Sequence, residues 1–147
     1  MTIPHDGGAE EGASSHPSHS PAPPSDAPEQ ERPVLVLADH VLTGALVESL
    51  VEVAGHRPVL PQRGETPLDA IRRVHPELVL LDIEHQSARD DSVFDRARES
   101  GSRLLLFASG GDQRALARAG AEHDVATCRL PLPHREFAAM LARVLDR

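Results

Sequence analysis

The sequence predicts an α/β fold in which helices cover a parallel β-sheet, and three observations support this prediction. Two apolar runs rich in Val and Leu, Val34–Leu37 and Leu78–Leu81, are each followed closely by an aspartate, Asp39 or Asp82. Such runs are typical of strands buried on both faces of a parallel sheet. From Pro33 onward, strand-like and helix-like segments alternate five times. Gly, Pro and helix-capping residues separate these segments, so we expect a single α/β domain.

Five segments have the composition expected of β-strands. Each is short, rich in apolar residues, and bounded by polar residues, Gly or Pro. In chain order, we expect strands at residues 34–38, 57–60, 78–82 and 104–108, and an edge strand within 124–128.

Five helices are expected between and after the strands. The first, of about 14 residues, follows Asp39, because apolar residues recur there at helical spacing and Gly55 supplies a stop. The second has Thr66 as its cap and Pro67 at its first position, and it ends near His75, before a proline. The apolar stripe of the first helix consists of Leu42, Ala45, Leu46, Leu50 and Val53.

The same signals place the last three helices. The third covers Ser92–Ser100 and ends at Gly101. The fourth covers Gln113–Ala119 and ends at Gly120. The C-terminal helix carries a clear apolar stripe, which consists of Phe137, Met140, Leu141, Val144 and Leu145.

Five strands alternating with five helices over residues 33–147 match the doubly wound, flavodoxin-like arrangement. This is a five-stranded parallel sheet of strand order 2-1-3-4-5 with right-handed crossovers. Sheets of this kind bind ligands at the carboxyl ends of their strands, where the loops diverge. Asp39 and Asp82 follow the first and third strands, which are neighbours in this order. We therefore expect both carboxylates in one crevice.

Residues 1–32 differ in composition from the rest of the chain. They are rich in Pro, Ser, Gly, Ala and His and nearly free of large apolar residues, so they are expected to form a disordered tail. They hold six acidic residues and one Arg, which gives −5 of the net charge of −8 and leaves −3 for residues 33–147. We expect one folded domain at residues 33–147 and no nucleic-acid partner.

Several further features exclude classes of function. The single Cys128 cannot form an internal disulfide and is expected to be a small buried apolar residue. The N-terminus has no apolar signal region, and no apolar run approaches the roughly 20 residues of a membrane span. We therefore expect a soluble cytoplasmic protein without a membrane partner. All fifteen basic residues are Arg, which excludes lysine-based chemistry.

The most specific local pattern is PELVLLDIE at Pro76–Glu84, which is followed by Ala119–Ala121 and by Leu130–Leu132 before the last helix. In order and spacing, these segments resemble the receiver domain of bacterial two-component response regulators, the CheY-like domain. The resemblance covers residues 33–147. It implies the flavodoxin-like (βα)5 fold already expected and a signalling role rather than an enzymatic one.

The resemblance also implies a phosphorylation site with a metal ion. It assigns Asp82 as the phosphoacceptor and Asp39 as the second member of an acidic pair, with Ala38 where the first acid belongs. Asp39, Asp82 and the main-chain carbonyl of Glu84 would then hold Mg²⁺ weakly, because Mg²⁺ prefers hard oxygen ligands. No other cofactor is expected.

Three further positions differ from the family's switch residues. Ala108 stands where the family has a hydroxyl residue, with the adjacent Ser109 as an alternative if the loop is shifted by one position. Thr127 stands at the aromatic position of the fifth strand, and Leu130 stands where the family has a lysine. Arg129 precedes Leu130, but neighbouring strand residues point to opposite faces, so it is not expected to replace the lysine.

A phosphate on Asp82 would therefore find few groups to contact. A lysine at about 4 Å would contribute several kcal/mol at an effective dielectric constant of about 20, and Leu130 contributes none of it. A conformational switch needs contacts that differ between its two states, and those contacts are scarce here. The sequence predicts a degenerate receiver that acts as a signalling protein-interaction module largely independent of phosphorylation.

The resemblance places the partner surface on the fourth helix, fifth strand and fifth helix, for a histidine kinase or downstream regulator, or for a second copy in a homodimer. One alternative is a single-domain receiver phosphorylated on Asp82 in a two-component phosphorelay, which the retained Asp39 favours. Another is a haloacid dehalogenase-like hydrolase. It requires a second acid two residues after Asp39, where Val41 stands, and a lysine that this chain lacks.

Simpler structural roles stay open for several of these residues. Asp39 and Asp82 are each placed to cap a following segment, and Asp90 and Asp91 are expected to cap the third helix or to be solvated. Ser109–Asp112 favours a turn and helix cap over a phosphate-binding loop. Polar tail sequence accounts better than a metal site for the clustered histidines His5, His16 and His19.

Deleting Met1–Glu31 is expected to leave the melting temperature unchanged, because this segment has too few apolar residues to contribute to a core. Thermal unfolding followed by circular dichroism, on the full chain and on the shortened one, measures this. A marked drop in the shortened chain would show that the tail packs against the domain.

Overall fold

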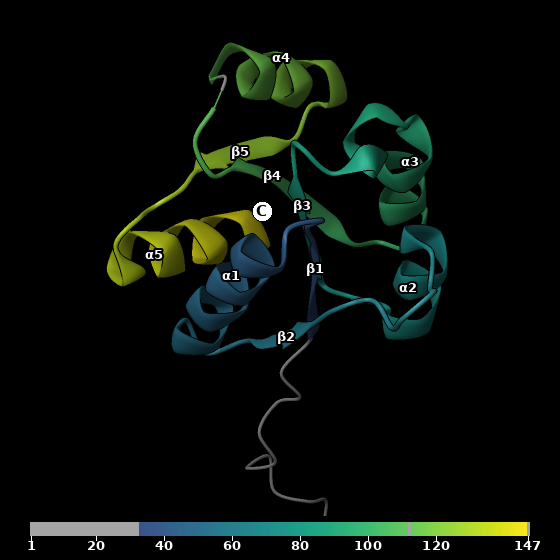
Figure 1. The fold of residues 1–147 in the computed structure, drawn as a ribbon, viewed down its shortest axis with the longest axis horizontal. Coiled ribbons are helices and arrows are strands. Elements are labelled where there is room, and N and C mark those ends of the chain that lie inside the picture. The colour runs from purple at the N-terminus through teal and green to yellow at the C-terminus, as the bar shows by residue number, and fades with distance from the viewer. Residues whose placement is uncertain (1–32, 112, 147) are drawn as a thin grey trace, which may run out of the picture. The chain divides into compact units, whose positions relative to one another are not determined.

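The computed structural model describes residues 33–111 and 113–146, which form one parallel sheet with helices on both faces (Figure 1). The sheet order is β2-β1-β3-β4-β5, and every neighbouring pair is parallel, which confirms the predicted flavodoxin-like fold. The strands are β1 (Pro33–Leu37), β2 (Arg57–Val59), β3 (Leu78–Asp82), β4 (Arg103–Ala108) and β5 (Ala126–Arg129). The tail expected at residues 1–32 and the capping residue Asp112 lie outside the described residues.

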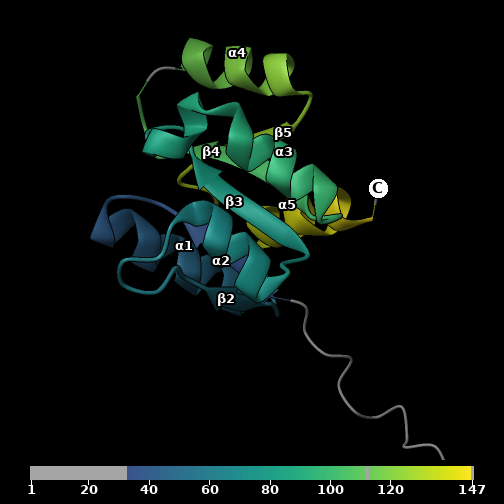
Figure 2. The same cartoon turned by 90° about the vertical axis from the view of Figure 1, so that its right-hand side faces the viewer.

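Two helices cover one face of the sheet and three cover the other. Figure 2 shows α2 and α3 in front of the sheet and α1 and α5 behind it. The helices are α1 (Val41–Val53), α2 (Pro67–Val74), α3 (Asp91–Glu99), α4 (Gln113–His123) and α5 (His134–Leu145), with a short 3₁₀ helix η1 (Gln86–Arg89). Among the described residues, no helix is both long enough and apolar enough to cross a membrane.

The apolar strands divide their side chains between two cores, as alternation along a strand requires. Val34 and Val36 pack with α1 and α5, whereas Leu35 and Leu37 pack with α2, α3 and α4. All four are completely buried. The prediction that these runs are buried on both faces is therefore confirmed. The stripe of α5 also packs as predicted, with Phe137, Leu141 and Val144 buried and Met140 and Leu145 partly buried against the same core.

Two helix starts follow the predicted capping chemistry. Thr66 Oγ1 accepts the Asp69 N–H at 3.1 Å at the start of α2, and Pro67 occupies the first turn. Asp90 Oδ1 accepts the Ser92 N–H at 2.9 Å at the start of α3, whereas Asp91 is the first residue of that helix. These side chains satisfy backbone N–H groups that the helix itself leaves without partners.

The predicted core-facing stripe of α1 is wrong for most of its members. Leu50 is buried, but Leu42 is 85% exposed and Val53 is 62% exposed. The residues that face the sheet are Gly44, Val47, Leu50 and Val51. Because α1 has apolar residues on nearly every side, periodicity alone does not identify the buried face. One consequence is an apolar surface on the outside of α1.

The predicted end of the fourth helix at Gly120 is also wrong, because α4 continues to His123. Gly120 instead allows α4 to lie close to Val125 and Thr127. A Cβ atom at this position would lie 2.4 Å from Thr127 Cγ2 and 3.2 Å from the Val125 carbonyl oxygen. Glycine is therefore required where α4 crosses the start of β5, and not as a helix stop. The predicted edge strand was also placed too early, since β5 extends to Arg129.

Gly120→Ala is expected to destabilise the domain by roughly 1–3 kcal/mol, because the added methyl overlaps Thr127 Cγ2. Combining it with Thr127→Ser, which removes Cγ2, is expected to restore most of the loss. Gly44→Ala is the matched control. Nothing lies within 4 Å of a Cβ at Gly44, so alanine there is expected to stabilise α1 by up to about 1 kcal/mol. Urea unfolding measures all three, and equal effects at the two glycines would contradict the packing argument.

Candidate functional site

The site is built where β1 and β3 end side by side. Leu37 is the parallel partner of Leu81, so the residues that follow each strand leave the sheet at the same edge. His85, in the loop after β3, links the two. Its N–H donates to the Asp82 carbonyl oxygen at 2.9 Å, and its Nε2 lies 3.3 Å from Asp39 Oδ1. The structure therefore brings Asp39 and Asp82 to one edge of the sheet, with an imidazole beside Asp39.

Asp82 is the last residue of β3 and is only 1% exposed. Its Oδ1 accepts the Glu84 N–H at 2.9 Å, whereas its buried Oδ2 has no hydrogen-bond partner. Burial raises the pKa of the Asp82 carboxyl above its ordinary value. The Glu84 N–H and the nearby His40 and His85 act in the opposite direction but do not reverse the shift. The site thus favours the neutral acid more than water does.

Asp39 does not cap α1, so that simpler interpretation is wrong. The N-cap residue of α1 is His40, and no side chain hydrogen-bonds to this helix start. Asp39 instead turns toward the loop after β3, where Oδ2 accepts the Gln86 N–H at 3.4 Å and Oδ1 faces His85. Asp82 caps no helix either, since His85 caps η1 and Asp90 caps α3.

Sequence analysis missed His85, although it lies between the two acids. His85 Nδ1 accepts the Ser87 N–H at 3.0 Å at the start of η1. A nitrogen that accepts a hydrogen bond carries no proton, so the proton of the neutral ring lies on Nε2 and faces Asp39. In this tautomer His85 is a hydrogen-bond donor to Asp39 and not a metal ligand. The only sequence signal was the position of His85 just before a short helical turn.

The positions that the resemblance marks as altered differ in their surroundings. Ala38 is partly buried against the core of α1 and α5, and Ala108 is buried at the end of β4. Ser109 is exposed as the next residue. Leu130 is 2% exposed and belongs to the core that α1 and α5 share, whereas Arg129 is exposed. Arg129 and Leu130 therefore face different environments, as expected from strand alternation.

Thr127 has a packing role in this structure. It lies on β5, and its Cγ2 is the atom nearest to the place that a side chain on Gly120 would occupy. Thr127 thus fills the contact between β5 and α4. Sequence analysis placed Thr127 among the altered switch positions but did not anticipate this contact.

The oxygen donors at this edge fit Mg²⁺ only in part. The buried Oδ2 of Asp82 has no partner and suits a cation. Against this, the described residues place no three His, Cys, Asp or Glu side chains together to hold a metal ion. Asp39, Asp82 and the Glu84 carbonyl would leave water to complete an octahedral shell, and two carboxylates make a weak site.

A groove of about 540 Å³ opens beside Asp39. It lies between the start of α1, the segment joining β2 to α2, and the loop after β3. Apolar and acidic side chains line it together, among them Asp39, Val41, Glu48, Leu60, Pro61 and His85.

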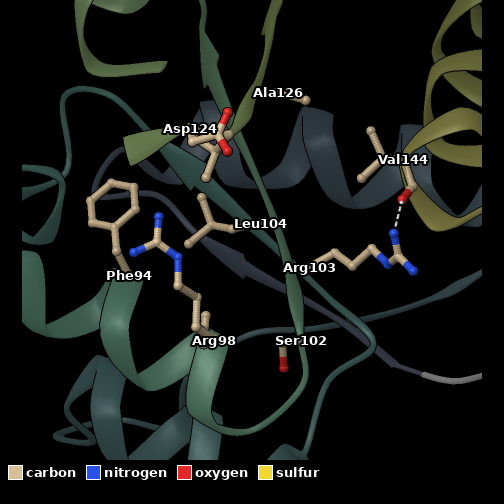
Figure 3. A pocket seen from close by; sticks show the side chains of 10 residues that line it. Phe94, Arg98, Ser102, Arg103, Leu104, Asp124, Ala126 and Val144 are labelled. Carbon is tan, nitrogen blue, oxygen red and sulfur yellow. Dashed lines mark hydrogen bonds between the residues drawn. The ribbon is translucent and has the colours of Figure 1, made fainter. Parts of the chain in front are cut away.

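A second hollow, of about 210 Å³, lies at the opposite edge of the sheet, near the starts of β4 and β5 (Figure 3). Arg98 and Arg103 extend to different sides of Leu104. Arg98 donates to the carbonyl oxygen of His123, the last residue of α4, and Arg103 donates to that of Val144 in the last turn of α5 at 3.1 Å. Both guanidinium groups thus satisfy carbonyls at helix C-termini, which is a structural role.

Asp82→Asn is expected to stabilise the domain at neutral pH, because burial raises the pKa of the Asp82 carboxyl and opposes its charged form, whereas the amide is neutral. The folded state holds the Asp82 proton more tightly than the unfolded state, so wild-type stability falls as pH rises from the ordinary pKa of 3.8 through the raised one. The advantage of Asn should therefore shrink as pH falls toward 3.8. Urea unfolding at several pH values measures it, with the exposed Asp95→Asn as control.

Comparison with known proteins points to one family, although no protein-family model matches the chain. The chain is 25% identical over 96 residues to the polar-differentiation response regulator DivK of Brucella ovis, across 60% of this chain and 78% of DivK. Its fold is similar to that of a putative response regulator from Chloroflexus aurantiacus, with a TM-score of 0.66 and 20% identity over 80% of this chain and 100% of the other.

NtrX from Brucella abortus also shares the fold, with a TM-score of 0.66 and 19% identity over 80% of this chain. The chain spans only 26% of NtrX, so the comparison concerns the fold alone. The match to DivK and the shared topology agree with the position of Asp82 at the end of β3. The chain is thus similar in sequence to a response regulator and has the fold of response-regulator receiver domains.

Proposed function

We propose that this receiver domain regulates by binding a protein partner and that its conformation does not depend on phosphorylation. The observation that carries the proposal is the burial of Leu130 in the core, at the position where the family has its lysine. The chain contains no lysine at all, so no residue of that type stands in for it.

The environment of Asp82 opposes an added phosphate. A phosphoryl group brings a charge of about −1.5 to −2, and burial, which raises the pKa of the Asp82 carboxyl, already disfavours negative charge there. The neighbouring Asp39 adds like charge. His85 supplies one N–H to Asp39, which offsets little of this charge. Phosphorylation would therefore meet an electrostatic cost without a built-in cation to lower it.

Few side chains near Asp82 could change conformation in response to a phosphate. Ala108 presents a methyl group where a hydroxyl would donate a hydrogen bond, and the exposed Thr127, which lies against Gly120, has no aromatic ring to reorient. A modification shifts a conformational equilibrium only as far as its contacts differ between the two states. Weak Mg²⁺ binding by Asp39, Asp82 and the Glu84 carbonyl stays part of the proposal and would supply positive charge at this edge.

We propose a partner surface on α4, β5 and α5, as the resemblance implies. That surface is rich in exposed arginine, namely Arg118, Arg129, Arg135 and Arg143. A histidine kinase or a downstream regulator with a complementary acidic surface would fit it. A homodimer through these elements would bring like charges together, which disfavours a symmetric pair.

The second candidate function is a single-domain receiver phosphorylated on Asp82 in a phosphorelay. The proximity of Asp39 and Asp82 at one edge of the sheet favours it, as does the exposed hydroxyl of Ser109 next to Ala108. The similarity to DivK, itself a response regulator, is compatible with both candidates.

Incubation with acetyl phosphate and Mg²⁺, followed by intact-mass measurement, distinguishes the two. We expect no stable phosphoform, and we expect the amide resonances of Thr127–Leu130 to stay in place. The Asp82→Asn variant identifies any modification elsewhere. A phosphoform that disappears in Asp82→Asn, with large shifts at Thr127–Leu130, would establish the phosphorelay function instead.

A further inference from the structure

The exposed large apolar side chains gather around α1. Among the described residues, Val41 is 84% exposed at the start of this helix, and Leu60, in the segment after β2, is 38% exposed. Helix α1 and strand β2 are adjacent at one side of the molecule (Figure 1). The other members of this set all lie on α1: Leu42, Leu46 and Val53. Two of the five, Val41 and Leu60, line one groove, and exposed apolar side chains beside a groove favour a surface that another molecule covers.

The groove beside Asp39 is part of this surface. Val41, Leu60 and Pro61 supply apolar walls, and Asp39 and Glu48 supply negative charge. A further acid of the lining, Glu65, is paired with Arg73 at 2.7 Å, and no arginine lines the groove. The groove is therefore apolar and acidic together, unlike the arginine-rich surface of α4, β5 and α5.

We propose that this groove binds a segment of a partner protein in which apolar residues flank an Arg or Lys side chain. The apolar residues would cover Val41 and Leu60, and the cation would lie against Asp39 and Glu48. The inference rests on the proposed function as an interaction module and specifies the surface and the chemistry of the partner. It places the apolar contact on α1 rather than on α4, β5 and α5, because interface centres are apolar and excluded from water.

Charge distinguishes this partner from the other candidates. The first 32 residues of the chain hold six acids and one Arg, so they repel the acidic groove instead of complementing it. A second copy docked symmetrically would bring Asp39 and Glu48 against their own counterparts. A second copy docked through its arginine-rich surface matches in charge, but that surface offers few large apolar side chains to cover Val41.

Two synthetic helical peptides test the proposal, with the same leucine pattern and either arginine or glutamate at the flanking positions. Fluorescence anisotropy with the full-length, unmodified chain measures their binding. We expect the arginine peptide to bind at least about tenfold more tightly, and its affinity to fall as salt rises, because exposed charges are screened. Equal binding of the two peptides, or binding of neither, would overturn the proposal.

Substitutions on the same surface locate the binding site. Val41→Ser combined with Leu60→Ser is expected to weaken the arginine peptide at least about tenfold, and Glu48→Gln at least about threefold, the effect of losing one charged contact. The matched controls are Val53→Ser and Glu52→Gln, which change the same residue types on α1 outside the groove. Thermal unfolding checks that each variant is folded. Equal losses in the controls would show general attraction to an acidic protein and would refute the groove.

Light scattering on the full-length chain separates a second copy from a foreign partner. A dimer that disappears in the Val41→Ser and Leu60→Ser double variant would assign the groove to self-association and overturn the proposal. A monomer supports it. The phosphodonor experiment is independent of these results, because a phosphoform at Asp82 contradicts the proposed function while leaving peptide binding by the unmodified chain unaffected.

Discussion

The parallel pairing of β1 with β3 is the constraint on which the site depends. Each strand is buried on both faces, so its register is fixed by two cores at once. With Leu37 opposite Leu81, the chain leaves both strands at one edge, and Asp82 ends β3 inside the protein rather than in water. The raised pKa of Asp82 and its contact through His85 with Asp39 follow from that placement.

The sequence was sufficient for the elements that local chemistry specifies. Strand order followed from alternating periods, and the starts of α2 and α3 followed from Thr66 and Asp90, whose side chains act within their own turns. The sequence was insufficient where the role of a residue depends on packing against another element. Apolar residues surround α1, so only the packed structure shows which of them face the sheet. Gly120 is indistinguishable in sequence from a helix stop, because its need for space arises from Thr127, on another element.

In the candidate site, too, some features could be predicted from the sequence and others could not. The placement of Asp39 and Asp82 at one edge follows from topology, and the burial of Leu130 follows from strand alternation. The role of His85 does not, because it depends on which ring nitrogen accepts the Ser87 N–H, and that is a property of one loop conformation. Sequence analysis missed the apolar surface of α1 for a related reason: most of the residues that predicted a buried stripe, Leu42, Leu46 and Val53 among them, are exposed in the structure.

An acidic edge without a resident cation must be balanced in some other way. Burial raises the pKa of Asp82 and so disfavours negative charge on that carboxyl, whereas Asp39 faces an N–H of His85 and accepts a main-chain N–H of Gln86. Glu48 adds a second acidic side chain along the groove that Asp39 lines. Charge that the fold does not neutralise attracts a cation from outside, and the exposed Val41 next to it favours a cation carried by an apolar protein segment over a free ion. In the function that we propose, this edge is therefore a surface whose chemistry selects a partner.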